Sequence, residues 1–116
     1  MLLVIIVGIK KDPNFGHVMM FGGGGIFTNL IIDRNLRLLP VDRFNAIEMI
    51  RDSKVSKLLY GFRDDSQYPI SELLYLMEKL SDLVLNFPEF EEIEINPLII
   101  THDDLWAVDG KAIISI

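Results

Sequence analysis

The chain opens with a continuous apolar run rather than with an alternating pattern. Residues 1–8 are apolar and rich in valine and isoleucine, which predicts a strand in the middle of a sheet, buried on both faces. Turn-forming residues at 10–16 separate it from a second apolar stretch at 17–21, so we expect a hairpin. Residues 26–32 and 36–39 predict two further strands.

The middle of the chain has the residue spacing of helices. Asp42 is suited to cap a helix that runs to about Arg51, and residues 53–59 predict a short second helix. Ser71 is then expected to cap a long helix, in which apolar residues recur with the helical period and which ends before Pro88.

The last part of the chain returns to strand patterns. Residues 90–101 alternate with period two, so that Ile93 and Ile95 face one way and Glu92, Glu94 and Asn96 the other. Residues 105–109 and 112–116 provide a returning strand. We therefore expect a single α+β domain that covers residues 1–116.

The predicted final hairpin brings oxygen ligands together. If its two-residue turn is His102-Asp103, residues whose numbers add up to 205 face each other, so Asn96 lies opposite Asp109 and Glu94 opposite Lys111. An amide oxygen and a carboxylate on one face suit Mg²⁺, which takes its other ligands from water and phosphates. The alternative is a solvated strand face with one ion pair, and spacing alone favours that alternative.

Composition excludes several classes of protein. A net charge of −6 and a pI near 4.7 argue against a protein that wraps nucleic acid. The chain has no cysteine, and its first apolar run is far shorter than the roughly 20 residues of a membrane span, so we expect a cytoplasmic protein without membrane contact. Half of the residues are hydrophobic and the mean hydropathy is +0.33, which predicts that some apolar surface meets a partner, a second copy included.

Two other features are candidates for binding. The run Gly22–Gly25 can approach phosphate oxygens closely, but it lacks the lysine of a P-loop and precedes a strand, so a flexible connection is the alternative. His17 and His102 lie in or beside turns and have no neighbouring groups arranged as a catalytic triad.

Taken together, several segments resemble one family in order along nearly the whole chain. It is the ATP-grasp domain of NDP-forming acyl-CoA synthetases, relatives of the succinyl-CoA synthetase β subunit. The matching segments are residues 8–16, 20–27, 58–63 and 94–98, together with Val108-Asp109. The resemblance implies the C-terminal subdomain of an ATP-grasp fold, a mostly antiparallel sheet with two to three helices.

The resemblance also implies roles for particular residues. Asn96 and Asp109 match the Mg²⁺ ligands of such enzymes, and Glu94 matches a catalytic glutamate that helps hold the phosphorylated histidine at the nucleotide site. Gly22, Gly24 and Gly25 match the loop on the phosphate side of bound ATP or ADP. The implied reaction interconverts acyl-CoA, ADP and phosphate with free acid, CoA and ATP through a phosphohistidine.

The chain also departs from the family pattern. The preceding ATP-grasp half and the CoA-binding part with its phosphorylated histidine are missing, so we expect them as partners and expect no turnover by this chain alone. Asn29 replaces the usual glutamate, His17 the usual proline and Gly23 a common leucine. The alternative is a non-catalytic remnant or docking domain that keeps the fold; an unrelated acidic binding module is a third hypothesis.

Overall fold

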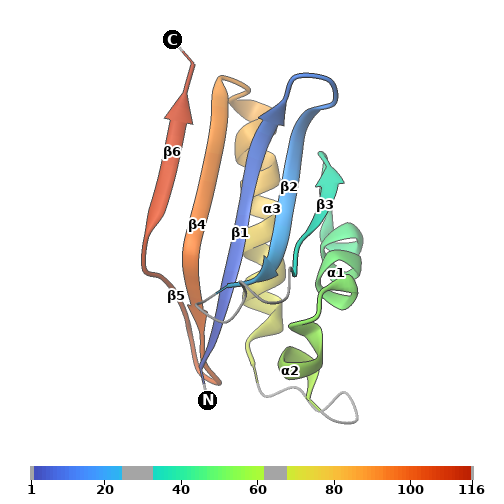
Figure 1. The fold of residues 1–116 in the computed structure, drawn as a ribbon, viewed down its shortest axis with the longest axis vertical. Coiled ribbons are helices and arrows are strands. Elements are labelled where there is room, and N and C mark those ends of the chain that lie inside the picture. Colours follow the sequence, from blue (N-terminus) through green and yellow to red (C-terminus); the bar gives the residue numbers. More distant parts are fainter. Residues whose placement is uncertain (1, 25–32, 62–67, 116) are drawn as a thin grey trace.

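The computed structural model describes residues 2–24, 33–61 and 68–115, which form one sheet with helices against one of its faces (Figure 1). Its sheet has six antiparallel strands in the order β3-β2-β1-β4-β5, with β6 also paired to β4. The strands are β1 (Leu3–Asp12), β2 (Gly16–Gly23), β3 (Asn35–Leu38), β4 (Phe90–Ile100), β5 (Leu105–Ala107) and β6 (Gly110–Ile114). The described helices are α1 (Arg43–Asp52), α2 (Ser56–Tyr60) and α3 (Ile70–Asn86).

The first strand lies in the centre of the sheet, as its apolar sequence predicts. β1 pairs with β2 on one side and with β4 on the other. Its hairpin with β2 is longer than expected, because Lys10, Lys11 and Asp12 continue the ladder and pair with Val18, His17 and Gly16. The predicted strand at residues 26–32 lies outside the described residues.

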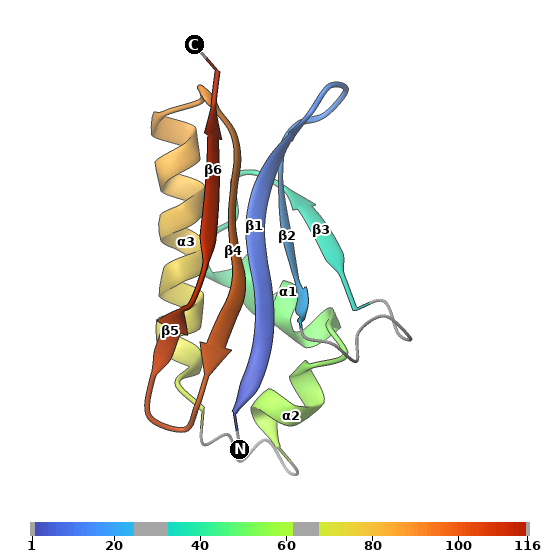
Figure 2. The same ribbon diagram turned by 60° about the vertical axis from the view of Figure 1, so that its left-hand side comes forward.

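The helices cover one face of the sheet, where the hydrophobic core forms (Figure 2). Alternate residues of β1 point into this core, among them Ile5, Val7 and Ile9. They meet helix residues such as Met77 and Met49, both fully buried. The prediction of an α+β domain with a mostly antiparallel sheet is therefore confirmed.

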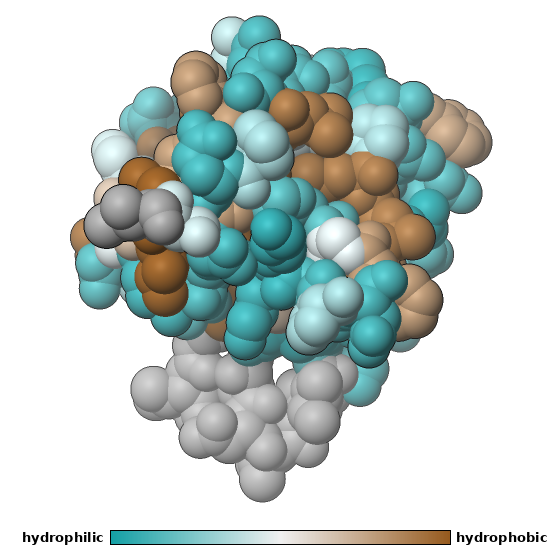
Figure 3. Space-filling view, turned by 90° about the horizontal axis from the view of Figure 1, so that it is seen from above, coloured by the Kyte–Doolittle hydropathy of each residue, from teal (hydrophilic) through white to brown (hydrophobic). Residues whose placement is uncertain are grey.

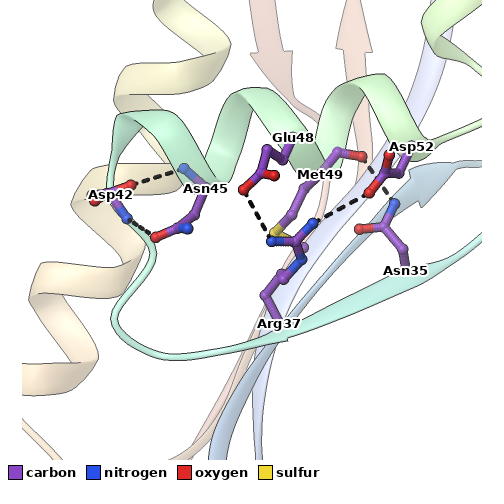
Figure 4. Close-up of polar contacts among 7 residues, drawn as sticks. All are labelled: Asn35, Arg37, Asp42, Asn45, Glu48, Met49 and Asp52. Atoms are coloured by element: carbon purple, nitrogen blue, oxygen red, sulfur yellow. Dashed lines mark hydrogen bonds and ion pairs between the residues drawn. The ribbon is translucent and has the colours of Figure 1, made fainter.

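A capping box begins α1, as the sequence predicts at Asp42 (Figure 4). The Asp42 carboxylate accepts a hydrogen bond of 2.8 Å from the backbone N–H of Asn45, and the Asn45 side chain accepts one of 3.3 Å from the Asp42 N–H. Two backbone donors that the first helical turn leaves unpaired are thereby satisfied. The long helix differs from expectation, since α3 begins one residue before Ser71 and no side chain caps it.

Replacement of Asp42 by alanine is expected to lower the free energy of unfolding by about 1 kcal/mol, because a side-chain cap is lost. Urea unfolding followed by far-UV circular dichroism measures this. Asp42→Ser, which keeps a capping oxygen, is the matched control and should stay close to wild type. An alanine variant as stable as the serine variant would contradict the role of the cap.

The edge strand β3 is fastened to α1 by polar contacts (Figure 4). Asn35 donates to the backbone oxygen of Met49 at 2.9 Å. Arg37 lies between Glu48 and Asp52, with nitrogen–oxygen distances of 3.3 and 3.2 Å. These ion pairs are half-exposed and contribute little stability, so they chiefly orient the strand.

Several large apolar side chains remain exposed. Seen from the end with the β1–β2 turn, hydrophobic residues interrupt the hydrophilic surface in more than one place (Figure 3). Exposed residues include Phe15, Leu36, Leu38, Phe44, Trp106 and Val108. The expectation that such surface meets a partner stays a prediction. In the described part of the chain, no helix combines the length and apolarity needed to cross a bilayer.

Candidate functional site

The hairpin of β4 with β5 and β6 has the predicted register. Its two-residue turn is closed by the Thr101 N–H, which donates to the Asp104 oxygen at 2.9 Å. Beyond β5, the Asn96 N–H donates to the backbone oxygen of Asp109 at 3.1 Å. Asn96 and Asp109 therefore face each other across the hairpin, as the residue sum predicts.

Asn96 and Asp109 offer donors that suit a hard cation. Both residues are exposed, and Asp109 Oδ1 accepts a hydrogen bond of 2.8 Å from the Gly110 N–H, which fixes the carboxylate. An amide oxygen and one carboxylate fit a magnesium ion that brings nucleotide phosphates and water as its other ligands. Among the described residues, no group of three His, Cys, Asp or Glu side chains forms a fuller metal site. The metal role of the pair stays a prediction.

The alternation of β4 is interrupted at these residues, which corrects the prediction of a regular pattern through residue 101. Ile93 and Ile95 pack against the core, but Leu98 and Ile100, rather than Pro97 and Ile99, are the next to do so. The register between β1 and β4 shifts at the same level, between Ile5 and Val7. The peptide bond between Asn96 and Pro97 is cis.

The sheet face opposite the helices, called the open face below, carries the polar side chains of β4. Glu94 pairs with Gly8 of β1 on one side and with Lys111 of β6 on the other. A Cβ atom at Gly8 would lie 2.8 Å from the Ile93 backbone oxygen, so only glycine fits beside Glu94 there. Glycine at position 8 thus lets the two strands pair closely at the level of Glu94.

Glu92 and Glu94 share one cation. The Lys111 Nζ lies 3.1 Å from Glu92 Oε1 and 3.7 Å from Glu94 Oε2. The hydrogen bond to Glu92, followed by the charges of Glu92 and Glu94, raises the pKa of Lys111 above its ordinary value of 10.5. The ammonium group is therefore charged at neutral pH.

A depression of about 370 Å³ lies on the open face. One side is apolar, with Val18, Met20 and Leu36, and the other carries Lys10 and the two glutamates of β4. The floor includes Gly8. Such a mixture of apolar wall and few charged groups is typical of sites for small polar ligands.

The glycine run starts at the same level of the sheet as Asn96. Gly22 pairs with Ile6, beside the irregularity of β4, so it lies about 10 Å from that strand, two strand spacings away. The Gly24 N–H donates to the Val4 oxygen at 2.7 Å, and Gly25 lies outside the described residues. The phosphate role of Gly22, Gly24 and Gly25 stays a prediction.

Close packing explains part of the run independently of any ligand. A Cβ atom at Gly22 would lie 1.6 Å from the Asp33 backbone oxygen. The Gly23 N–H donates to Asp33 Oδ2 at 2.9 Å. Glycine at both positions therefore lets Asp33 pack directly against the end of β2.

Asp33, which lies between the predicted strands at 26–32 and 36–39, is a structurally important residue that the sequence analysis did not single out. Its buried carboxylate accepts hydrogen bonds from the backbone N–H groups of Gly23, Lys54 and Val55, at 2.9, 2.6 and 3.0 Å. It joins the end of β2 to the connection between α1 and α2. No spacing in the sequence indicates this contact, because its partners are 10 to 22 residues away.

The histidines make structural contacts. His17 Nε2 donates to the backbone oxygen of Phe90 at 2.7 Å, which ties β2 to the start of β4. His102 packs edge-on against Tyr68, with 4.7 Å between ring centroids. Neither contact belongs to the open face at Glu94.

The protein is an α+β domain whose antiparallel sheet is covered by helices on one face and carries charged side chains and a depression on the other. Comparison with known proteins gives the particular family. The family model described as an ATP-grasp domain matches residues 3–114. The chain therefore belongs to the ATP-grasp domain family.

Two relatives are ADP-forming acid–CoA ligases. The β subunit of ADP-forming acetate–CoA ligase I from Pyrococcus furiosus is 39% identical over 110 residues, which cover 95% of this chain and 47% of that subunit. The ADP-forming 4-hydroxybutyrate–CoA ligase of Nitrosopumilus maritimus is 38% identical over 96 residues, covering 83% of this chain and 14% of that ligase. The chain thus spans less than half the length of these relatives.

A solved structure agrees. The dinucleotide-forming acetyl-coenzyme A synthetase 1 of Candidatus Korarchaeum cryptofilum, in complex with coenzyme A and Mg-AMPPCP, matches with a TM-score of 0.85 and 31% identity. The match covers 97% of this chain and 53% of that one, in a structure whose phosphohistidine segment points towards the nucleotide-binding site. This similarity confirms the resemblance to the family and makes an unrelated binding module untenable.

Proposed function

We propose that this chain forms the nucleotide- and magnesium-binding part of an ADP-forming acid–CoA ligase. The observation that carries the proposal is the register of the hairpin, which sets Asn96 opposite Asp109 on the exposed side of β4. The similarity to ADP-forming ligases supports it independently. Magnesium held there neutralises the charge of the nucleotide phosphates.

Glu94 is the residue to which we assign the role of the catalytic glutamate. It projects from the same strand as Asn96, two residues away, and its side chain is 22% exposed. A carboxylate there accepts a hydrogen bond from an imidazole N–H and so orients the ring of an incoming phosphohistidine. The relative whose phosphohistidine segment points towards its nucleotide site supports this role.

The proposed reaction needs more than this chain. The ligase converts acyl-CoA, ADP and phosphate into acid, CoA and ATP, and the groups that bind CoA and carry the histidine lie outside these 116 residues. The preceding ATP-grasp half covers the other side of the nucleotide. Leu36, which lines the depression, is 63% exposed, and Leu38, two residues along β3, is 54% exposed; both support a partner over the open face.

Calorimetric titration of the chain with ATP or ADP, with and without Mg²⁺, tests the proposal. We expect magnesium-dependent binding, weakened at least about tenfold in Asp109→Ala and in Asn96→Ala because each removes one oxygen ligand. Asp103→Ala, an exposed aspartate at the turn of the same hairpin, is the matched control and should keep wild-type affinity.

Two outcomes would count against the proposal. Equal affinity of the wild-type and Asp109→Ala chains would show that the nucleotide binds elsewhere. Absence of magnesium-dependent binding by the wild-type chain would favour a non-catalytic remnant that keeps the fold.

A further inference from the structure

The ammonium group of Lys111 lies between two carboxylates of β4. It is 3.1 Å from a Glu92 oxygen and 3.7 Å from a Glu94 oxygen, on neighbouring outward positions of β4. The two carboxylates are largely shielded, with side-chain exposures of 18% and 22%, whereas Lys111 is 55% exposed. The two carboxylates extend from β4, and the Lys111 side chain reaches them from the neighbouring strand β6.

Without this ammonium group, the Glu92 and Glu94 carboxylates could bind one bare cation together, with water as its other ligands. Two carboxylates that already point to one position need only small side-chain rotations to reach the 2.3–2.6 Å bonds that Ca²⁺ makes with oxygen. That site would lie next to the Asn96–Asp109 pair, since Glu94 and Lys111 are each two residues from one member of it. A metal ion bound between Glu92 and Glu94 without nucleotide would lie outside the Asn96–Asp109 pair.

We infer that Lys111 is a built-in counter-ion that fills the cation position between Glu92 and Glu94 and thereby confines divalent metal to Asn96 and Asp109. The inference goes beyond the proposed function and rests on it only for the identity of the metal pair. Its consequence is that the open face needs a nucleotide to hold magnesium, because the Lys111 ammonium group already offsets one of the two carboxylate charges and lies between them.

Titration of the folded chain with Ca²⁺ alone, followed by calorimetry, tests this. Lys111→Met keeps most of the apolar stem and removes the charge, so we expect Ca²⁺ to bind at least about tenfold more tightly than to wild type. Lys111→Arg keeps the positive charge and should bind no better than wild type. The gain should disappear in Lys111→Met combined with Glu92→Gln.

The result that would overturn the inference is a Lys111→Met chain with no gain in Ca²⁺ affinity, or an equal gain in Lys111→Arg. Circular dichroism checks that each variant is folded, and Lys111→Gln replaces the methionine variant if that one does not fold. The gain should persist when Asp109→Ala is added, whereas the magnesium-dependent nucleotide binding should not. The two proposals can therefore fail separately.

Discussion

Asp33→Ala is expected to lower the free energy of unfolding by about 3 kcal/mol or more, because it leaves backbone N–H groups without an acceptor in a buried place. The three donors belong to Gly23, Lys54 and Val55, and their common acceptor is 8% exposed. A small domain has only about 5–15 kcal/mol of stability in total, so the variant should unfold at a much lower urea concentration. Urea titration followed by circular dichroism measures the change.

Asp12→Ala is the matched control for this experiment. The Asp12 carboxylate also accepts backbone hydrogen bonds, from Asn14 and Phe15, but it does so in an exposed turn. Water can replace it there, so we expect a loss of at most about 1 kcal/mol. Similar losses in the two variants would show that burial of the Asp33 carboxylate is unimportant.

Gly22→Ala is the second substitution with a large expected effect. Its new Cβ atom would lie 1.6 Å from the Asp33 backbone oxygen, so either β2 or the Asp33 segment must move. Overpacking of this kind costs about 1–3 kcal/mol, and the shift would also disturb the hydrogen bonds of the Asp33 carboxylate. We expect a loss of about 3 kcal/mol, measured by thermal and urea unfolding.

Gly110→Ala provides the comparison for Gly22. A Cβ atom at Gly110 meets its nearest neighbour, the Glu94 oxygen, at 3.5 Å, which is ordinary contact. The change in stability should stay within about 0.5 kcal/mol. If Gly22→Ala is equally harmless, close packing is not the reason for glycine at position 22, and a ligand becomes the better explanation.

The final hairpin was predictable because its pattern is local. Alternation assigns the faces of residues 90–96, and a two-residue turn at His102-Asp103 then sets every cross-strand pair. The N-cap at Asp42 was predictable for the same reason, since its partner is three residues away. The family resemblance, now confirmed, supplied the proposed roles of Asn96, Asp109 and Glu94.

Features that depend on distant segments were not predictable. The carboxylate of Asp33 and the bond from His17 to Phe90 join residues that no sequence period connects. The shift of β4 at Asn96-Pro97 interrupts a pattern that otherwise continues on both sides. Lys111 was expected opposite Glu94, but its closer contact with Glu92 depends on a side-chain conformation.

The central position of β1 also affects how the chain forms during synthesis. Leu3 pairs with Ile100, so almost the whole chain must be made before the ladder with β4 can close. At ribosomal rates of about 5–20 residues per second, this takes about 5–20 seconds. Meanwhile β2 can pair with β1, but the edge of β1 that β4 covers in the folded chain stays open to other chains. The nascent protein therefore passes through a stage in which early contact with a chaperone would be an advantage.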